Sequence, residues 1–238
     1  MTSFAQVKAL SFDCYGTLID WETGILGALR PMLSRHDVAC DDDRLLGLYA
    51  AAESALEAGP YRPYREVLRE ATQRMAAELA FEPTAGELEL LADSLPGWPP
   101  FPDTIEALRT LKARFRLAIA SNIDDDLFAA TERRLGVKFD LVTTAQQVRS
   151  YKPAPAHLLR TLEKLGIGRE AKPAELVHVA QSLFHDIGPA KALGITTVWV
   201  NRRCGRTGSG ATPPSAARPD YEVPDLRGLV TLTDPAGG

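Results

Sequence analysis

Hydrophobic and polar positions divide the chain into three parts. A short apolar run ends at Asp13, and residues 18–97 then carry apolar side chains at helical spacing. From residue 98 onward, helical segments alternate with short apolar runs, which predict buried strands at 116–120, 139–144, 176–180 and 197–200. This alternation predicts an α/β fold, a Rossmann-like parallel sheet with helices on both faces, with a helical segment inserted after the first strand.

The predicted helices and boundaries follow from the same pattern. Prolines crowd residues 96–102, which excludes a regular helix and marks the return from the insert. The expected domains are a core of residues 1–17 and 98–238 and a helical cap of residues 18–97. Pro31 is expected to kink or end the first helix of the insert. Helices are predicted at 22–35, 44–57, 64–79, 84–95, 104–114, 124–135, 155–165 and 187–193. A surface loop is predicted at 206–219, an edge strand at 221–223, and a last helix or turn at 225–232.

Composition narrows the class of protein. The 238 residues carry a net charge of −4, which gives no indication of a nucleic-acid or membrane partner. No apolar run is long enough to span a bilayer, and no signal peptide is recognised at the N-terminus. The three cysteines are far apart, which favours a reducing compartment, and we expect a cytoplasmic protein. Asp41, Asp42 and Asp43 are read as a helix cap in preference to a metal site.

Reactive side chains follow four of the predicted strands. Asp13 ends the first strand, Ser121 and Asn122 end the second, and Lys152 lies in the loop after the third. The fourth strand leads to Gln181 and Ser182, and then to Asp186. Because ligands bind at the carboxyl ends of parallel strands, these residues should meet at one rim of the sheet.

Each of these residues also has a plain structural explanation. Asp13 and Asp186 could cap the helices that follow them, Ser121-Asn122 could form a turn, and Lys152 could be an exposed lysine before a proline. Their coincidence at successive strand ends favours a site for nucleophilic catalysis. Asp13 would attack and form an ester, Lys152 would keep Asp13 ionised, and Asp186 would activate water against the ester.

The order Asp13, Ser121-Asn122, Lys152-Pro153 and Asp186, with a helical insert after the first strand, resembles the haloacid dehalogenase (HAD) superfamily. The match covers nearly the whole chain. The resemblance implies a Rossmann-like core, a helical cap and an aspartyl-ester intermediate. The Asp-x-Tyr-Gly-Thr form of the first motif, together with Asn201-Arg202 and the run from Pro219 to Val223, is similar to the L-2-haloacid dehalogenases.

Two departures separate the chain from the phosphatases of this superfamily. Those enzymes carry a second aspartate two residues after the nucleophile, where this chain has Tyr15, and a metal-binding carboxylate where it has Gln181. Without the metal, a phosphate dianion would meet uncompensated repulsion at Asp13. We therefore expect no metal and no other cofactor, and a leaving group that needs no proton.

Two departures separate it from the dehalogenases. In the fourth motif, they have an asparagine and a tryptophan shortly before the last aspartate, where this chain has Leu183 and His185. The other departure concerns the halide. They hold the departing halide with an arginine on the second cap helix, where this chain has Ala50 or a neighbour. Arg44, Arg62 or Arg65 could reach the site from elsewhere. We predict that His185, with Trp21 or Tyr49, lines the leaving-group pocket, and that His185 could donate a hydrogen bond to fluoride. Simple packing beside Asp186 is the other explanation of His185.

The resulting expectation is a metal-independent hydrolase of a short 2-halocarboxylate, a small-molecule substrate. Ser121 and Asn122, with backbone N–H groups after Asp13, would hold the substrate carboxylate. Ser182 and Gln181 would lie in the hydrogen-bond shell of Asp186. The alternatives are opening of a strained C–N ring, a phosphatase with a displaced metal site, and a non-catalytic HAD-like protein. The resemblance also makes a homodimer plausible.

Overall fold

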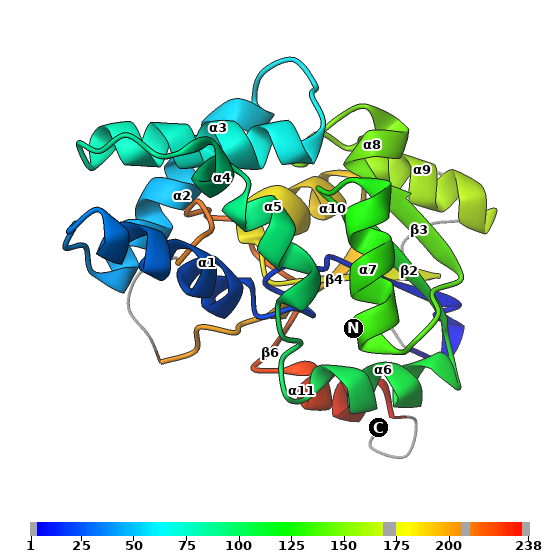
Figure 1. Ribbon diagram of the computed structural model, residues 1–238. Helices are drawn as coiled ribbons and strands as arrows, with labels where there is room; N and C mark the ends of the chain where they lie inside the picture. The colour runs from blue at the N-terminus through cyan, green and yellow to red at the C-terminus, as the bar shows by residue number, and fades with distance from the viewer. Residues whose placement is uncertain (1–3, 169–174, 206–209, 235–238) are drawn as a thin grey trace.

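A six-stranded parallel sheet forms the centre of the computed structural model, which describes residues 4–168, 175–205 and 210–234 (Figure 1). The strand order is β3-β2-β1-β4-β5-β6. This is the doubly wound arrangement that the alternating pattern predicted. The strands are β1 (Ala9–Phe12), β2 (Arg116–Ser121), β3 (Leu141–Thr144), β4 (Leu176–Ala180), β5 (Thr196–Val200) and β6 (Tyr221–Val223).

Helices cover both faces of the sheet because successive strand residues point to opposite sides. Leu10 and Phe12 belong to the larger apolar cluster, which takes in residues of α6, α7 and α11. Ala9 belongs to a smaller cluster with residues of α9 and α10. These helices are α6 (Thr104–Lys112), α7 (Asp125–Leu135), α9 (Ala156–Leu165), α10 (Gly188–Ala192) and α11 (Leu226–Thr233).

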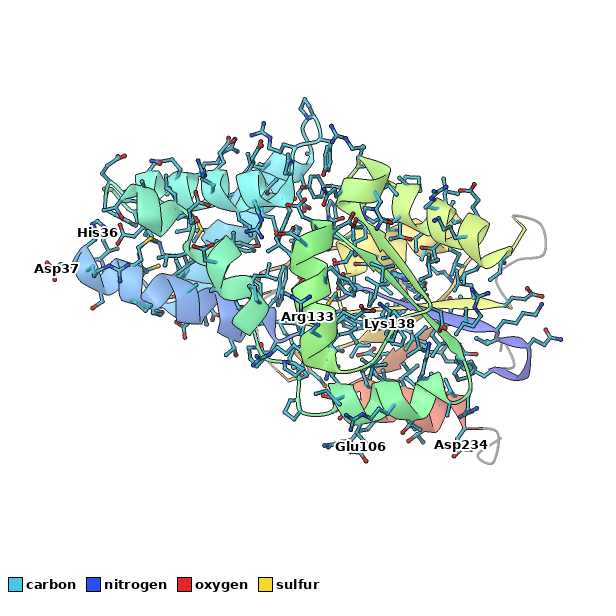
Figure 2. All side chains as sticks on the ribbon, turned by 45° about the vertical axis from the view of Figure 1, so that its right-hand side comes forward. His36, Asp37, Glu106, Arg133, Lys138 and Asp234 are labelled. Carbon is cyan, nitrogen blue, oxygen red and sulfur yellow. The ribbon has the colours of Figure 1, made fainter. Side chains whose placement is uncertain are left out.

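Five helices are inserted between β1 and α6, and Figure 1 shows them together beside the sheet. These inserted helices are α1 (Trp21–Arg35), α2 (Asp42–Glu57), α3 (Tyr64–Glu78), α4 (Ala85–Leu88) and α5 (Leu90–Ser94). Pro31 does not end α1, although it removes one backbone donor from the helix. Figure 2 places His36 and Asp37 at the outer end of α1, far from the sheet.

Several boundaries differ from those predicted. The helix expected over 84–95 is divided into α4, α5 and a 3₁₀ turn, Leu95–Gly97, which contains Pro96. The strand expected from 139 begins at Leu141, because the Phe139 N–H donates to the Glu132 carboxylate. A short helix α8 (Ala145–Val148) was not predicted, and a π-helix, Leu183–Ile187, precedes α10. Part of the loop predicted at 206–219, residues 206–209, lies outside the described residues.

Two linkers join the inserted helices to the sheet domain, and they run side by side. The Asp20 N–H donates to the Pro99 carbonyl, and the Phe101 N–H donates to the Leu18 carbonyl. A further contact holds the start of α3, where the N–H groups of Tyr64 and Arg65 donate to the Asp124 carboxylate. Within the ranges that the structure describes, no helix combines the length and apolarity needed to cross a membrane.

Candidate active site

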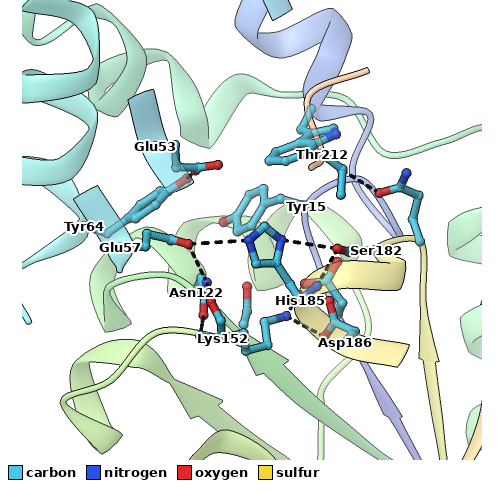
Figure 3. Close-up of a pocket in the computed structure, with 14 residues that line it drawn as sticks. Tyr15, Glu53, Glu57, Tyr64, Asn122, Lys152, Ser182, His185, Asp186 and Thr212 are labelled. Carbon is cyan, nitrogen blue, oxygen red and sulfur yellow. Dashed lines mark hydrogen bonds and ion pairs between the residues drawn. The ribbon is translucent and has the colours of Figure 1, made fainter. Parts of the chain in front are cut away.

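A small cavity of about 40 Å³ lies at the carboxyl ends of the strands, between them and α2 (Figure 3). Space of this size holds about three water molecules or a short organic molecule. Tyr49, the alternative to Trp21, does not line the cavity, whereas the residues predicted for catalysis and substrate binding do: Asp13, Tyr15, Trp21, Ser121, Asn122, Lys152, Gln181, Ser182, His185 and Asp186. Glu53, Glu57, Tyr64 and Thr212, which were not predicted, also line it.

Asp13 follows β1 directly and is fixed by the sharp loop after it. Gly16 has a φ of +90°, a backbone conformation that favours glycine, and a Cβ there would lie 2.9 Å from Trp21 Nε1. The turn brings the Thr17 hydroxyl to donate to Asp13 Oδ2 at 2.8 Å, and the same hydroxyl accepts the Gln181 N–H. Burial raises the pKa of Asp13, and Lys152 opposes this rise.

Lys152 is the electrostatic centre of the rim. Its ammonium group donates to Asp13 Oδ1 at 2.8 Å, to Asp186 Oδ1 at 2.7 Å and to the Ala120 carbonyl at 3.0 Å. These contacts use all three ammonium hydrogens. Burial lowers the pKa of Lys152, but the two carboxylates outweigh burial and the net shift is upward. Lys152 therefore stays charged and holds both carboxylates in place.

The two carboxylate oxygens of Asp186 differ in their hydrogen bonding. His178, in β4, contacts Asp186 Oδ1 through Nε2 at 2.9 Å, and its Nδ1 contacts the Ser11 hydroxyl at 2.9 Å. Asp186 Oδ2 has no hydrogen-bond partner among the residues that the structure describes. Burial raises the pKa of Asp186, but Lys152 and His178 outweigh it and keep the pKa below the usual range. The free oxygen is therefore that of an ionised carboxylate. His178 was not predicted as a site residue, and the structure pairs it with Ser11 in the register of β4 with β1.

The predicted side-chain contacts of Gln181 and Ser182 with the Asp186 carboxylate are not among the hydrogen bonds of the described residues, although the Ser182 carbonyl accepts the Asp186 N–H at 3.3 Å. The Ser182 hydroxyl accepts the His185 N–H and contacts His185 Nδ1, so it caps the π-helix. Gln181 Oε1 instead accepts from the Thr212 hydroxyl. Burial lowers the pKa of His185 to about 4, which leaves its ring neutral near pH 7.

Asn122 joins two loops at the rim. Its Oδ1 accepts the Lys152 backbone N–H at 2.8 Å, and its Nδ2 donates to Glu57 Oε2 at 2.9 Å and to the Lys152 carbonyl at 3.3 Å. Both amide hydrogens are therefore engaged in the structure. Ser121 is buried at the end of β2 and lines the cavity beside it.

Aromatic side chains close the cavity on the side of the inserted helices. The Tyr15 hydroxyl contacts Thr131 at 2.8 Å, and the Trp21 ring meets Tyr49 edge to face. The arginines proposed to reach the site do not line it. Arg62 pairs with Glu70, Arg65 pairs with Asp126, and Arg44 is exposed.

Two buried glutamates of α2 face the rim. They lie on the helix where the resemblance to the dehalogenases implied a halide-binding arginine. Glu53 Oε1 accepts from the hydroxyls of Tyr49 and Tyr64. Glu57 bonds Asn122 and lies 3.9 Å from His185 Nε2. Sequence reasoning missed both, but a signal existed: polar residues at positions 49, 53 and 57 repeat every four residues on a helix whose other buried positions are apolar.

Comparisons with known proteins agree with this arrangement. The family model for haloacid dehalogenase-like hydrolases matches residues 7–194. The chain belongs to the haloacid dehalogenase-like hydrolases. It is 31% identical to an (S)-2-haloacid dehalogenase of Xanthobacter autotrophicus, over 83% of this chain and 76% of the relative. It is 26% identical to haloacetate dehalogenase H-2 of Moraxella sp. (strain B), over 95% of this chain and 98% of the relative.

Solved structures show the same HAD fold. The crystal structure of a defluorinating L-2-haloacid dehalogenase, Rha0230, superposes with a TM-score of 0.76 at 27% identity, and the match covers 95% of each chain. This HAD-like hydrolase therefore has the Rossmann-like fold expected from its sequence. Among the described residues, no group of three or more histidine, cysteine, aspartate or glutamate side chains has the geometry of a metal site.

Proposed function

We propose that this protein is a metal-independent hydrolase that displaces halide from a short 2-halocarboxylate through an ester on Asp13. The observation that carries the proposal is the lysine shared by two carboxylates, Asp13 and Asp186, at the floor of one cavity. The relatives named as 2-haloacid and haloacetate dehalogenases support the choice of substrate.

The first step is a displacement at carbon. An oxygen of Asp13 attacks the carbon that bears the halogen, a C–O bond forms, and the halide leaves with the electron pair of the C–halogen bond. Halide needs no proton, so Tyr15 can occupy the position where phosphatases of this superfamily carry an acid. Thr17 and Lys152 hold the attacking carboxylate in one orientation.

The second step regenerates Asp13. Water attacks the carbonyl carbon of the ester and gives a proton to Asp186, whose Oδ2 is free to accept it. The acyl C–O bond breaks, and the departing alkoxide takes the proton from Asp186. The water oxygen stays in the Asp13 carboxyl, whose remaining proton passes to solvent. The sum is RX + H₂O → ROH + H⁺ + X⁻.

The remaining predicted residues position the substrate in this proposal. Ser121 and backbone N–H groups after Asp13 would receive the substrate carboxylate, and Asn122 would fix the loop that carries Lys152. His185, neutral near pH 7, and Trp21 would line the leaving-group pocket. Residues 18–97 would act as a cap that moves on the paired linkers and excludes water when closed. The free, separated cysteines favour a cytoplasmic enzyme, and a homodimer stays a prediction.

Halide release tests the proposed function. Purified protein would be incubated with chloroacetate, fluoroacetate and each enantiomer of 2-chloropropionate, with EDTA present and with Asp13→Asn as the control. We expect release that persists in EDTA and falls by at least about a thousandfold in the control. Activity on phosphate esters that requires added Mg²⁺, with no halide release, would favour the phosphatase alternative and contradict the proposal.

A further inference from the structure

The wall of the cavity opposite Asp13 carries carboxyl groups in place of a cation. Glu53 and Glu57 lie one turn apart on α2, and both are buried, with exposed fractions of 4% and 8%. Together with Asp13 and Asp186 they bring four carboxyl groups to the cavity lining, against the single ammonium of Lys152. All three hydrogens of that ammonium are already used.

A second observation concerns the hydrogen bonds of Glu57. Its Oε2 accepts from Asn122, whereas Oε1 is buried without any partner in the described residues. Figure 3 shows the Glu57 carboxyl group directed toward the space between Asn122 and His185. Buried carboxylate oxygens are normally satisfied, so a free one beside a catalytic cavity marks a place for a donor that arrives with the ligand.

We propose that Glu57, supported by Glu53, binds a protonated nitrogen of the substrate, so that the enzyme acts on short alkyl compounds that carry an ammonium group near the carbon attacked by Asp13. The inference rests on the proposed Asp13 ester chemistry, but it names a halogenated alkylammonium in place of a simple 2-halocarboxylate as the preferred substrate. An ammonium group supplies both the donor that Glu57 Oε1 lacks and the positive charge that the lining lacks. A protonated strained C–N ring belongs to the same class of cation.

The surroundings of the two glutamates couple cation binding to proton release. Burial, reinforced by Glu53, raises the pKa of Glu57 well above its usual range, and Lys152 opposes this effect. Burial also raises the pKa of Glu53 to about 6, opposed by the hydroxyls of Tyr49 and Tyr64.

Other ionisable groups also face this pair, among them Tyr151, whose pKa is raised by burial and by the two glutamates. Asp13 raises the pKa of both glutamates, and the neutral ring of His185 faces Glu57 from the π-helix. An entering cation favours the ionised carboxylate and therefore expels a proton. An entering anion favours the protonated carboxyl group, and its binding therefore takes up a proton.

Equilibrium binding to the unmodified protein gives the most direct test. Ethylammonium and acetate would each be titrated by calorimetry at pH 6 to 7, in buffers of different ionisation enthalpy. We expect ethylammonium to bind at least about tenfold more tightly than acetate and to release protons as it binds. Tighter binding of acetate, or binding of neither probe, would overturn the inference.

Charge-removing variants identify the residues. In Glu57→Gln the amide oxygen can still accept from Asn122, so the main change is the loss of a group that can ionise when a cation binds. We expect ethylammonium affinity to fall at least about tenfold, and the exposed control Glu78→Gln to bind like the parent protein. Unchanged affinity in a folded Glu57→Gln protein would contradict the inference. Glu53→Gln provides a second variant if Glu57→Gln does not fold.

Turnover separates this inference from the proposed function. Halide release would be compared for 2-chloroethylammonium, neutral chloroacetamide and anionic chloroacetate. The inference predicts the highest kcat/KM for the ammonium compound and a loss of that preference in Glu57→Gln. If chloroacetate is the best substrate and Glu57→Gln lowers all three rates equally, the ammonium site is refuted and the dehalogenase function stands. If ethylammonium binds through Glu57 but no halide is released, the site stands and the Asp13 chemistry fails.

Discussion

The two walls of the cavity differ in how well their polar groups are satisfied. On the sheet side, the ammonium group of Lys152 donates all three hydrogens, to two carboxylates and one carbonyl. His178 and Thr17 form further hydrogen bonds with the same two carboxylates. On the side of α2, Glu57 keeps a buried oxygen without a partner, and no cation lies opposite it in the described lining. The satisfied wall fixes the reacting groups, whereas the unsatisfied wall is suited to recognising a ligand.

Removing the charge of Lys152 should have the largest effect. Lys152→Met keeps an unbranched side chain of similar length but leaves Asp13 and Asp186 facing each other without a cation. We expect halide release to fall at least about a hundredfold and the free energy of unfolding to fall by about 3–5 kcal/mol near pH 7. Kinetics and urea denaturation measure the two effects.

A double variant sharpens this result. Adding Asp13→Asn to Lys152→Met removes one of the opposed charges, so part of the lost stability should return while activity stays absent. Full activity in Lys152→Met would show that the ion network of the sheet wall does not serve catalysis.

His178 should affect one step of the reaction more than the other, because it contacts Asp186 and not the cavity. In His178→Gln we expect a normal first turnover of halide release followed by a steady state about ten to a hundred times slower, since Asp186 acts only on the ester. Rapid-mixing halide detection resolves this burst. The buried His157 in α9, which has no hydrogen bond to Asp186, provides the control His157→Gln. Equal slowing of both phases would contradict a role through Asp186.

Replacing Glu53 should have the smallest effect. This effect is on the free energy of unfolding. Burial raises the pKa of Glu53 from 4.5 to about 6, so the folded protein holds a proton that the unfolded chain has released between these pH values. This carboxyl group therefore lowers stability as pH rises above about 4.5. Glu53→Gln should be more stable than the parent protein by about 2 kcal/mol at pH 7 and about equal to it at pH 4. Denaturation at the two pH values measures the difference, and a pH-independent gap would refute the explanation.

The sheet wall could be predicted from sequence because its residues follow strands in an α/β order. Asp13, Asn122, Lys152 and Asp186 all end or follow parallel strands, and strand ends share one rim whatever the details of packing. The fold class and the strand segments followed from the same periodicity.

The wall formed by α2 could not be predicted in this way. The rotation of α2 about its axis decides whether Ala50, Glu53 or Glu57 faces the rim, and that rotation depends on packing against α1 and α3. The links of Ser182 to His185 and of Gln181 to Thr212 depend on loop conformations that no periodicity encodes. His178 was hidden because a buried strand residue gives no sign of the side chain that it meets.

The central claim is the ester on Asp13, and trapping it is the most direct test. Asp186→Asn protein, which lacks the water-activating carboxylate, would be mixed with chloroacetate and, separately, with 2-chloroethylammonium, then digested and analysed by mass spectrometry. The account predicts a mass increase equal to the transferred alkyl group, confined to the peptide that contains Asp13 and absent when Asp13→Asn is added. Halide release by this variant without any adduct on Asp13, or with an adduct elsewhere, would contradict it.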